Sequence, residues 1–319
     1  MRAAVVVLGG LALGCAPADG DDTDGLDTDA VDTDLAGEPC VPGDAVERVA
    51  GEGVALRFLA VDNGRNRLAL VDEIDGGGWE VAIPPGARDL AVVGDEVLLS
   101  VGTGAVWLAL ADGAERDRVD GFTGVQSARP LADGGLLLGR QDGLDAVLTT
   151  LDAAGDVVGE VRVPTSVELR LVRPLPDGHV LLTRGPPYRV VEVDAEGAEV
   201  WAVDLPGKGY VAERWCGEAT TYATTGADAR LVALAADGAI TGSWGGREAH
   251  ADVGLDWASG FHLLPGGVAV VTNWLGHVSS DFGPHVVAWG PDDTLLWSWD
   301  PDGIDKITNV RVLAARGLP

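Results

Sequence analysis

Residues 169–201 read LRLVRPLPDGHVLLTRGPPYRVVEVDAEGAEVW, a run of four short apolar segments separated by Gly, Pro and Asp. Apolar and polar residues alternate within the segments, as in 188–194, and this period of two is typical of a half-buried β-strand. Turn residues separate the segments, with Leu-Pro-Asp-Gly at 175–178 and Asp-Ala-Glu-Gly at 194–197. The unit therefore predicts a four-stranded antiparallel sheet, which must pack its apolar faces against neighbouring sheets.

The same unit recurs along the chain. Its last turn is matched at 75–76, 112–113, 154–155, 196–197, 237–238 and 292–293, at steps of 37, 42, 42, 41 and 55 residues. Four-stranded repeats of about 40 residues are typical of propeller blades. We predict an all-β fold, a six-bladed β-propeller over residues 41–319, closed by a strand at 307–313 that pairs with the first or the last blade. Seven blades would require another unit before Asp75.

The repeats also resemble a known family. The turn at 175–178 followed by DAEGAEVW at 194–201 resembles the PQQ-like, or quinoprotein-type, repeat. The segments TNWLGH at 272–277, GPHVVAW at 283–289 and LWSWD at 296–300 resemble exported bacterial six-bladed propellers, which are distantly similar to arylsulfotransferases. The resemblance implies the propeller architecture. It does not imply a quinone, because blades two and three lack the matching Trp and no residue set specifies that ligand.

The first residues predict export. Met1 and Arg2 precede an apolar run at 3–13, about half of the roughly 20 residues that a membrane-spanning helix needs, so residues 1–14 are interpreted as a signal peptide. Residues 12–15 read ALGC and resemble a bacterial lipobox. We expect Cys15 to carry a lipid anchor. In the Gram-negative lipoproteins that this segment resembles, an Asp after the Cys favours retention in the inner membrane. Because Ala16 stands there, the resemblance implies the outer membrane, on its periplasmic or surface face; ordinary signal cleavage is the alternative.

Residues 15–40 are predicted to form an acidic, disordered tether, since eight Asp between 19 and 34 repel one another and few apolar residues accompany them. Calcium binding is the alternative, but the spacing lacks the Gly and Glu of an EF-hand loop. Lipidation of Cys15 leaves Cys40 and Cys216. An oxidising compartment favours a disulfide between them, and two free thiols are the alternative.

The charge of the chain limits its partners. Lys plus Arg number 22 and Asp plus Glu number 50, which gives a formal net charge of −28. Such a protein repels phosphate backbones, so no nucleic-acid partner is expected. The expected partners are the membrane, through the lipid anchor, and a small-molecule or protein ligand. No cofactor is firmly predicted, and a divalent metal stays open.

Two long loops indicate the face that carries the binding site. In an up-and-down blade, the turns between second and third strands emerge on the same face as the links between blades, and the longest such segments are 245–256 and 273–285. Their side chains suggest a ligand site, a divalent metal site or a general base. Hydrogen bonds that merely stabilise the loops are the alternative, because no metal-binding spacing occurs. The candidate residues are His250, Asp252, Asp256, His262, Asn273, Trp274, His277 and His285.

Arginines recur at one place in the repeat. Those expected to form a cationic ring on the axis, suited to an anion, are Arg129, Arg173 and Arg214. His262 occupies the matching position before Gly266. The alternative is that each Arg pairs with a nearby carboxylate between blades, such as Asp133 or Asp177.

These observations favour an exported lipoprotein whose propeller binds a ligand or a protein partner, with no clear catalytic machinery. One alternative is an enzyme, arylsulfotransferase-like or metal-dependent, that uses histidines of the last blade. Another is a scaffold for outer-membrane assembly.

Overall fold

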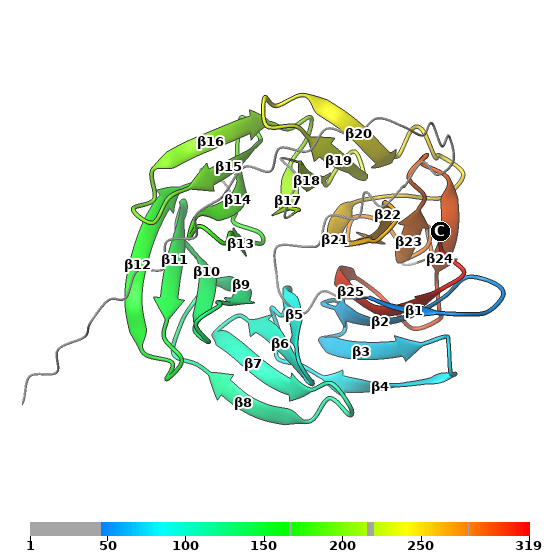
Figure 1. Ribbon diagram of the computed structural model, residues 1–319, viewed down its shortest axis with the longest axis horizontal. Coiled ribbons are helices and arrows are strands. Elements are labelled where there is room, and N and C mark those ends of the chain that lie inside the picture. The colour runs from blue at the N-terminus through cyan, green and yellow to red at the C-terminus, as the bar shows by residue number, and fades with distance from the viewer. Residues whose placement is uncertain (1–45, 166–167, 216–219, 280) are drawn as a thin grey trace, which may run out of the picture. The chain divides into compact units, whose positions relative to one another are not determined.

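The computed structural model describes residues 46–165, 168–215, 220–279 and 281–319, which form 25 strands. The strands build six blades around an axis (Figure 1), so the predicted six-bladed β-propeller is confirmed. None of the described residues forms a helix with the length and apolar character needed to cross a bilayer. The predicted signal peptide, lipidated Cys15, acidic tether and Cys40–Cys216 pair lie outside the described residues.

Five blades each consist of four consecutive antiparallel strands, the first near the axis and the fourth outermost (Figure 1). The second blade holds β5 (Leu90–Val93), β6 (Glu96–Val101), β7 (Gly104–Ala109) and β8 (Glu115–Val119). The third holds β9 (Val125–Pro130), β10 (Leu136–Asp142), β11 (Asp145–Leu151) and β12 (Val157–Pro164). The fourth holds β13 (Arg173–Pro174), β14 (Val180–Arg184), β15 (Arg189–Val193) and β16 (Glu199–Asp204). The fifth holds β17 (Gly209–Arg214), β18 (Thr221–Thr225), β19 (Arg230–Leu234) and β20 (Ile240–Gly245). The sixth holds β21 (Ala258–Leu264), β22 (Val268–Asn273), β23 (Val286–Trp289) and β24 (Leu295–Trp299).

The first blade closes the ring. Its strands are β25 (Ile307–Arg316), β2 (Ala55–Asp62), β3 (Arg67–Asp72) and β4 (Gly77–Ala82), and β1 (Glu47–Val49) runs parallel to β25. The C-terminal strand therefore supplies the inner strand of the blade that the N-terminal strands begin, and Phe58 lies opposite Val312 in the antiparallel pair. Of the two partners expected for the closing strand, the structure selects the first blade.

The recurrent Asp-x-x-Gly signature has a local cause. In the turn between β15 and β16, one carboxylate oxygen of Asp194 accepts hydrogen bonds from the backbone N–H groups of Glu196 and Ala198 at 3.0 and 2.8 Å. Gly197 adopts a φ of 84°, a left-handed conformation that a side chain disfavours. The same hydrogen bond from a backbone N–H to an Asp side chain occurs in the matching turns of other blades. The spacing of these turns along the sequence therefore equals the length of one blade.

The core lies between neighbouring blades. The strands on the axial side of each blade are buried on both faces, so the second strands β2 and β22 are largely apolar, whereas the outer strand β8 is mostly exposed. Between the sixth and first blades, Phe58 meets Trp297 and Trp299 edge-on, with ring centroids 5.7 and 5.2 Å apart. Each fully buried Leu or Phe contributes about 1.5–3 kcal/mol, so the blade faces hold the ring closed.

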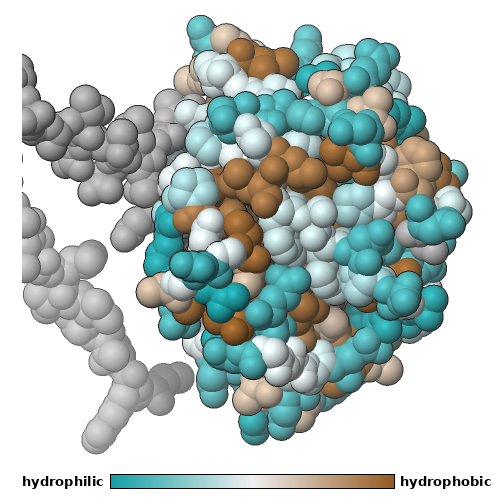
Figure 2. Space-filling model, turned by 90° about the vertical axis from the view of Figure 1, so that its right-hand side faces the viewer, coloured by the Kyte–Doolittle hydropathy of each residue, from teal (hydrophilic) through white to brown (hydrophobic). Residues whose placement is uncertain are grey.

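Apolar side chains also remain on the outer strands. Figure 2 looks at the side that is on the right in Figure 1, where apolar residues interrupt a hydrophilic surface. The exposed large apolar residues of the outer strands are Val157, Val158, Val200, Ile240 and Leu295. Scattered exposure of this kind is ordinary for a folded protein and does not by itself mark a site.

Candidate functional site

The inner strands carry a buried network of charges on the axis. Arg173 is 5% exposed and donates from Nη1 to Asp89 at 3.0 Å and from Nε to Glu213 at 2.6 Å. Arg129 is 1% exposed; its Nη1 donates to the carbonyl of Leu90 at 2.9 Å and lies 3.9 Å from Asp89. The low-dielectric surroundings make such pairing obligatory. Two arginines therefore meet two carboxylates across the axis.

Arg173 pairs with carboxylates of other blades, as in the alternative drawn from the sequence, but not with the two residues named there. Asp133 and Asp177 instead accept backbone N–H groups of their own turns, from Gly135 and His179. The reason is geometric: inner strands face one another across the axis, so a buried guanidinium meets carboxylates of other blades before those of its own turn. The side chain of Arg214 points away from the axis. It donates a hydrogen bond to Glu192 at 2.5 Å, and its guanidinium carbon lies 5.0 Å from the ring centroid of Trp201.

His262 is a buried, neutral member of the axial layer. Burial, followed by the charge of Arg129, lowers its pKa to about 3. Its Nδ1 accepts the backbone N–H of Val312 at 3.0 Å, which places the proton on Nε2. In this state His262 fastens β21 to the closing strand β25.

A cavity of ≈ 260 Å³ opens where the links between blades enter the inner strands, and we call it the axial pocket. It is built by the links that lead into inner strands, the starts of those strands and the turns between second and third strands. Five of the six blades contribute to it. The lining residues are Asn63, Arg88, Glu168, Arg170, Lys208, Tyr210, Trp257, Trp274, His277 and Thr308.

The axial pocket is basic in a strongly acidic protein. Three of its side chains are cationic, and Glu168 pairs with Arg170 at 2.7 Å and with Arg88 at 3.8 Å. Lys208 forms no ion pair or side-chain hydrogen bond with the rest of the described chain, and burial, followed by the charge of Arg170, lowers its pKa. Burial likewise lowers the pKa of Arg170. One local carboxylate thus faces three cations.

Several buried donors of the axial pocket lack acceptors. The Nε atoms of Arg88 and Arg170 and the hydroxyl of Tyr210 are buried, and no described residue accepts a hydrogen bond from them, although Arg88 lies close enough to that hydroxyl to interact with it. Burial raises the pKa of Tyr210, so its hydroxyl keeps its proton and remains a donor. Buried donors without acceptors are costly, and an anionic ligand would supply the missing acceptors.

An aromatic wall forms the opposite side of the pocket. The ring of His277 lies between Trp257 and Trp274, with centroid distances of 5.1 and 4.9 Å. Trp257 is held against Gly226, where a Cβ atom would come within 2.0 Å of the indole. The wall therefore depends on a glycine that leaves room for the indole ring.

Behind this wall, Asp256 faces His277. The carboxylate is 3% exposed, and one oxygen accepts from Arg247 at 2.7 Å. Its other oxygen, Oδ2, is buried without a hydrogen bond from the described residues and lies 3.5 Å from Nδ1 of His277. A carboxylate behind an imidazole is the arrangement that orients a general base.

Similarity to solved structures supports the fold. No family model matches the chain, and no curated protein matches it. A solved structure of a protein of unknown function from Bacteroides caccae is 19% identical, has a TM-score of 0.68, and covers 82% of this chain and 98% of its own. A streptogramin B lyase structure is 11% identical, with a TM-score of 0.55, over 86% of this chain and 89% of its own. Virginiamycin B lyase from Staphylococcus aureus is 11% identical, with a TM-score of 0.49, over 80% and 78%. The likeness to the first two of these structures supports the propeller fold alone. The finer resemblance to PQQ-like and arylsulfotransferase propellers stays a prediction.

The structure distributes the four candidate histidines over separate environments. His277 lines the axial pocket and His262 lies on the axis, whereas His250 packs on Trp289 at 4.5 Å and reaches Asp293 at 2.9 Å. His285 is 1% exposed, and burial lowers its pKa. Within the described ranges, no three metal-ligating groups from this set lie within 4.8 Å of one another.

The other two loop candidates have different surroundings. Asn273 clamps the two long loops: its side-chain oxygen accepts the N–H of Asp256 at 2.7 Å, and its amide donates to Gly254 and Pro284 at 3.0 and 2.8 Å. Asp252 is exposed on the first of these loops. Asn273 therefore acts on the axial pocket indirectly, by holding Asp256 in place behind the aromatic wall.

Reasoning from the sequence missed the basic half of the axial pocket. Arg88, Arg170 and Lys208 each lie shortly before an inner strand, in three different links. The available signal was positional, since Trp257 of the axial pocket also lies immediately before an inner strand. A search for polar residues immediately before each first strand would have found all three.

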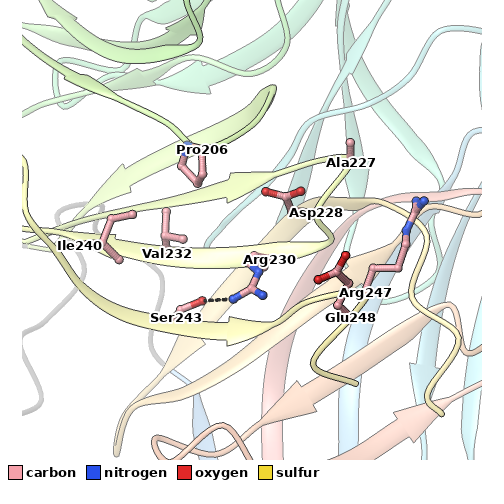
Figure 3. Close-up of a pocket in the computed structure, with 9 residues that line it drawn as sticks. All are labelled: Pro206, Ala227, Asp228, Arg230, Val232, Ile240, Ser243, Arg247 and Glu248. Atoms are coloured by element: carbon pink, nitrogen blue, oxygen red, sulfur yellow. Dashed lines mark hydrogen bonds between the residues drawn. The ribbon is translucent and has the colours of Figure 1, made fainter. Parts of the chain in front are cut away.

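A larger cavity of ≈ 570 Å³ lies beside the fifth blade, away from the axis (Figure 3). Arg230 points toward Ser243 there, and their hydrogen bond is 3.3 Å long. Asp228 and Glu248 balance Arg230 and Arg247, so this cavity offers no excess charge to a ligand. The axial pocket, with excess cations and buried donors, is the stronger candidate site.

Proposed function

We propose that this chain is an exported protein, lipid-anchored in the outer membrane, whose propeller binds a small organic anion in the axial pocket. One observation carries the binding part: three cationic side chains and unpartnered buried donors surround a ≈ 260 Å³ cavity in a chain of net charge −28. Maintaining that much positive charge on the axis is costly unless a ligand compensates it.

The shape of the pocket restricts the ligand. Its volume lies below the roughly 300–1,000 Å³ of sites for drug-sized molecules, so a compact molecule fits. Arg88 and Arg170 present planar forks that suit carboxylate, phosphate or sulfate oxygens, and Lys208 adds a point charge. Trp257 and Trp274 offer apolar surface to the rest of the ligand.

Calorimetric titration of the full chain with benzoate, and with inorganic sulfate, tests the proposal. Lys208→Gln removes one cation from the pocket, and Arg162→Gln removes one from the exposed strand β12 as a matched control. Because a hydrogen bond to a charged group contributes about 1.5–3 kcal/mol, Lys208→Gln should raise the dissociation constant at least about tenfold. The control should leave it unchanged. Equal affinities in the two variants, or no binding of either anion at millimolar concentration, would reject the axial site.

The anchoring part of the proposal is supported by the ALGC motif that ends at Cys15. Metabolic labelling with radioactive palmitate should mark the wild-type chain and leave Cys15→Ala unlabelled. Labelled chain in the inner-membrane fraction alone would contradict the proposed location, and unlabelled wild-type chain would contradict lipidation.

A second candidate function is catalysis in the same pocket, and the free Oδ2 of Asp256 behind His277 favours it. A base at His277 would take the hydroxyl proton of an acceptor while the basic side chains stabilise sulfuryl oxygens. Release of 4-nitrophenol from 4-nitrophenyl sulfate, with phenol as acceptor, tests this. Turnover that disappears in His277→Gln would establish the enzyme, and no turnover by the wild type would leave anion binding as the function.

A further inference from the structure

A second polar cluster lies at the end of the blades opposite the axial pocket, in the fourth blade. Asp177 belongs to the turn between β13 and β14, His179 immediately precedes β14, and Glu192 lies on β15. One ligand atom from each of these three side chains lies within 4.8 Å of the other two. Among the described residues, this is the group of three His, Cys, Asp or Glu side chains that meets such a limit.

The three potential ligand atoms converge on Nδ1 of His179. Oε1 of Glu192 is 2.7 Å from this nitrogen, and Oδ2 of Asp177 is 3.5 Å from it. Zn²⁺, with bonds of about 2.0–2.2 Å to nitrogen and oxygen, holds neighbouring ligand atoms about 3.3–3.6 Å apart. Small side-chain rotations would bring all three atoms to that spacing.

Each carboxylate is anchored by the oxygen that the cluster does not use. Oδ1 of Asp177 accepts the backbone N–H of His179 at 3.1 Å, which leaves Oδ2 directed at the imidazole. Oε2 of Glu192 accepts from Arg214 at 2.5 Å, and Arg214 is itself held by Thr221 at 3.1 Å. Outer partners of this kind orient metal ligands and reduce the ordering needed on binding.

The charge of the cluster also suits a dication. Asp177 and Glu192 carry two negative charges, of which Arg214 compensates one, and the chain as a whole is strongly acidic. A donor set of one imidazole nitrogen and two carboxylate oxygens fits zinc, whereas Ca²⁺ and Mg²⁺ prefer oxygen alone. Three protein ligands leave room for water on the side where the His179 side chain is 30% exposed.

We propose that Asp177, His179 and Glu192 form a Zn²⁺ site. The site is separate from the axial pocket and does not depend on the proposed anion binding. Bound zinc would connect the β13–β14 turn to β15 and, through Arg214, to the fifth blade. It would therefore stabilise the folded chain by an amount that grows with the logarithm of the zinc concentration once that concentration exceeds the dissociation constant.

Calorimetric titration of the full chain with ZnCl₂ tests the site. The wild type should show one binding event above the weak background of its acidic surface. His179→Gln should weaken that event at least tenfold, because it removes the nitrogen ligand while the background stays the same. Glu192→Gln, which retains an oxygen for Arg214, should weaken it comparably and serves as a second variant if His179→Gln folds poorly.

The matched control is His250→Gln. His250 also pairs with a carboxylate, at 2.9 Å from Asp293, but belongs to no three-ligand group among the described residues. Its substitution should leave zinc affinity unchanged. Co²⁺ provides a second readout, since wild type and His250→Gln should develop the visible absorption of a low-coordinate site that His179→Gln lacks. Equal zinc affinity in the wild type, His179→Gln and Glu192→Gln would overturn the proposal.

Discussion

Asp89 is the residue whose loss should most disturb the centre of the propeller. Its side chain is 0% exposed, and it accepts from Arg173 at 3.0 Å and from Asn309 at 3.1 Å, with Arg129 at 3.9 Å. Asp89→Asn keeps the size of the side chain and removes its charge. The perturbation therefore isolates the electrostatic part of the axial network.

The size of the effect follows from these contacts. The wild-type layer balances Arg129 and Arg173 with Asp89 and Glu213, and the substitution leaves one positive charge without a counter-charge. Three hydrogen bonds to a charged acceptor, from Ser127, Arg173 and Asn309, are weakened, each worth about 1.5–3 kcal/mol. Removing one partner of a buried ion pair costs about 3–5 kcal/mol. We therefore expect Asp89→Asn to lower the free energy of unfolding by about 3–5 kcal/mol.

Urea titration followed by tryptophan fluorescence measures this free energy. Adding Arg173→Met to Asp89→Asn removes the excess positive charge, so the double variant should be less destabilised than the sum of the single variants by at least about 1 kcal/mol. Asp142→Asn, which breaks an exposed pair with Arg162, is the control and should leave the midpoint unchanged. A loss of unfolding free energy below about 1 kcal/mol for Asp89→Asn would refute the idea that the buried charges balance one another. Strictly additive effects of the two substitutions would refute it as well.

Three further predictions concern the fold around the site. His262 has a pKa of about 3 when folded and about 6.5 when unfolded, so the unfolded chain binds more protons between these values and stability falls as pH drops through that range. Urea titrations between pH 7 and pH 4 measure the free energy of unfolding. This free energy should fall less steeply with pH in His262→Gln than in the wild type, by up to about 1.4 kcal/mol per pH unit. Parallel curves for the two proteins would contradict this. Gly226→Ala places a Cβ atom against Trp257, so it should lower the free energy of unfolding by about 1–3 kcal/mol. It should also weaken benzoate binding measured by calorimetry. Unchanged binding would show that the position of Trp257 does not affect the ligand. Removing residues 307–319 deletes β25, and size-exclusion chromatography with near-ultraviolet circular dichroism should detect no native propeller.

The blade architecture was predictable because its signals are local. Alternating apolar residues report a strand within six or seven positions, and turns such as 194–197 depend on hydrogen bonds between residues four apart. The partner of the closing strand was not predictable in this way. Phe58 and Val312 pair across most of the chain, so no local pattern reports their contact.

The candidate site was less accessible to the same reasoning. Loop length drew attention to Trp274 and His277, which the structure places in the axial pocket. Arg88, Arg170 and Lys208 occur in short links without a motif, so their convergence left no pattern along the chain. The axial arginines had a repeat position, but the carboxylates that compensate them occupy other blades.

From the sequence alone came the period of the repeat, the strand alternation and the turn chemistry, and these determine a ring of blades because each sheet must bury two apolar faces. Only the tertiary structure decided which side chains meet on the axis. The physical reason is that backbone pairing and burial are governed by neighbours along the chain, whereas charges in a closed ring interact through space with the nearest opposite charge, whichever blade supplies it.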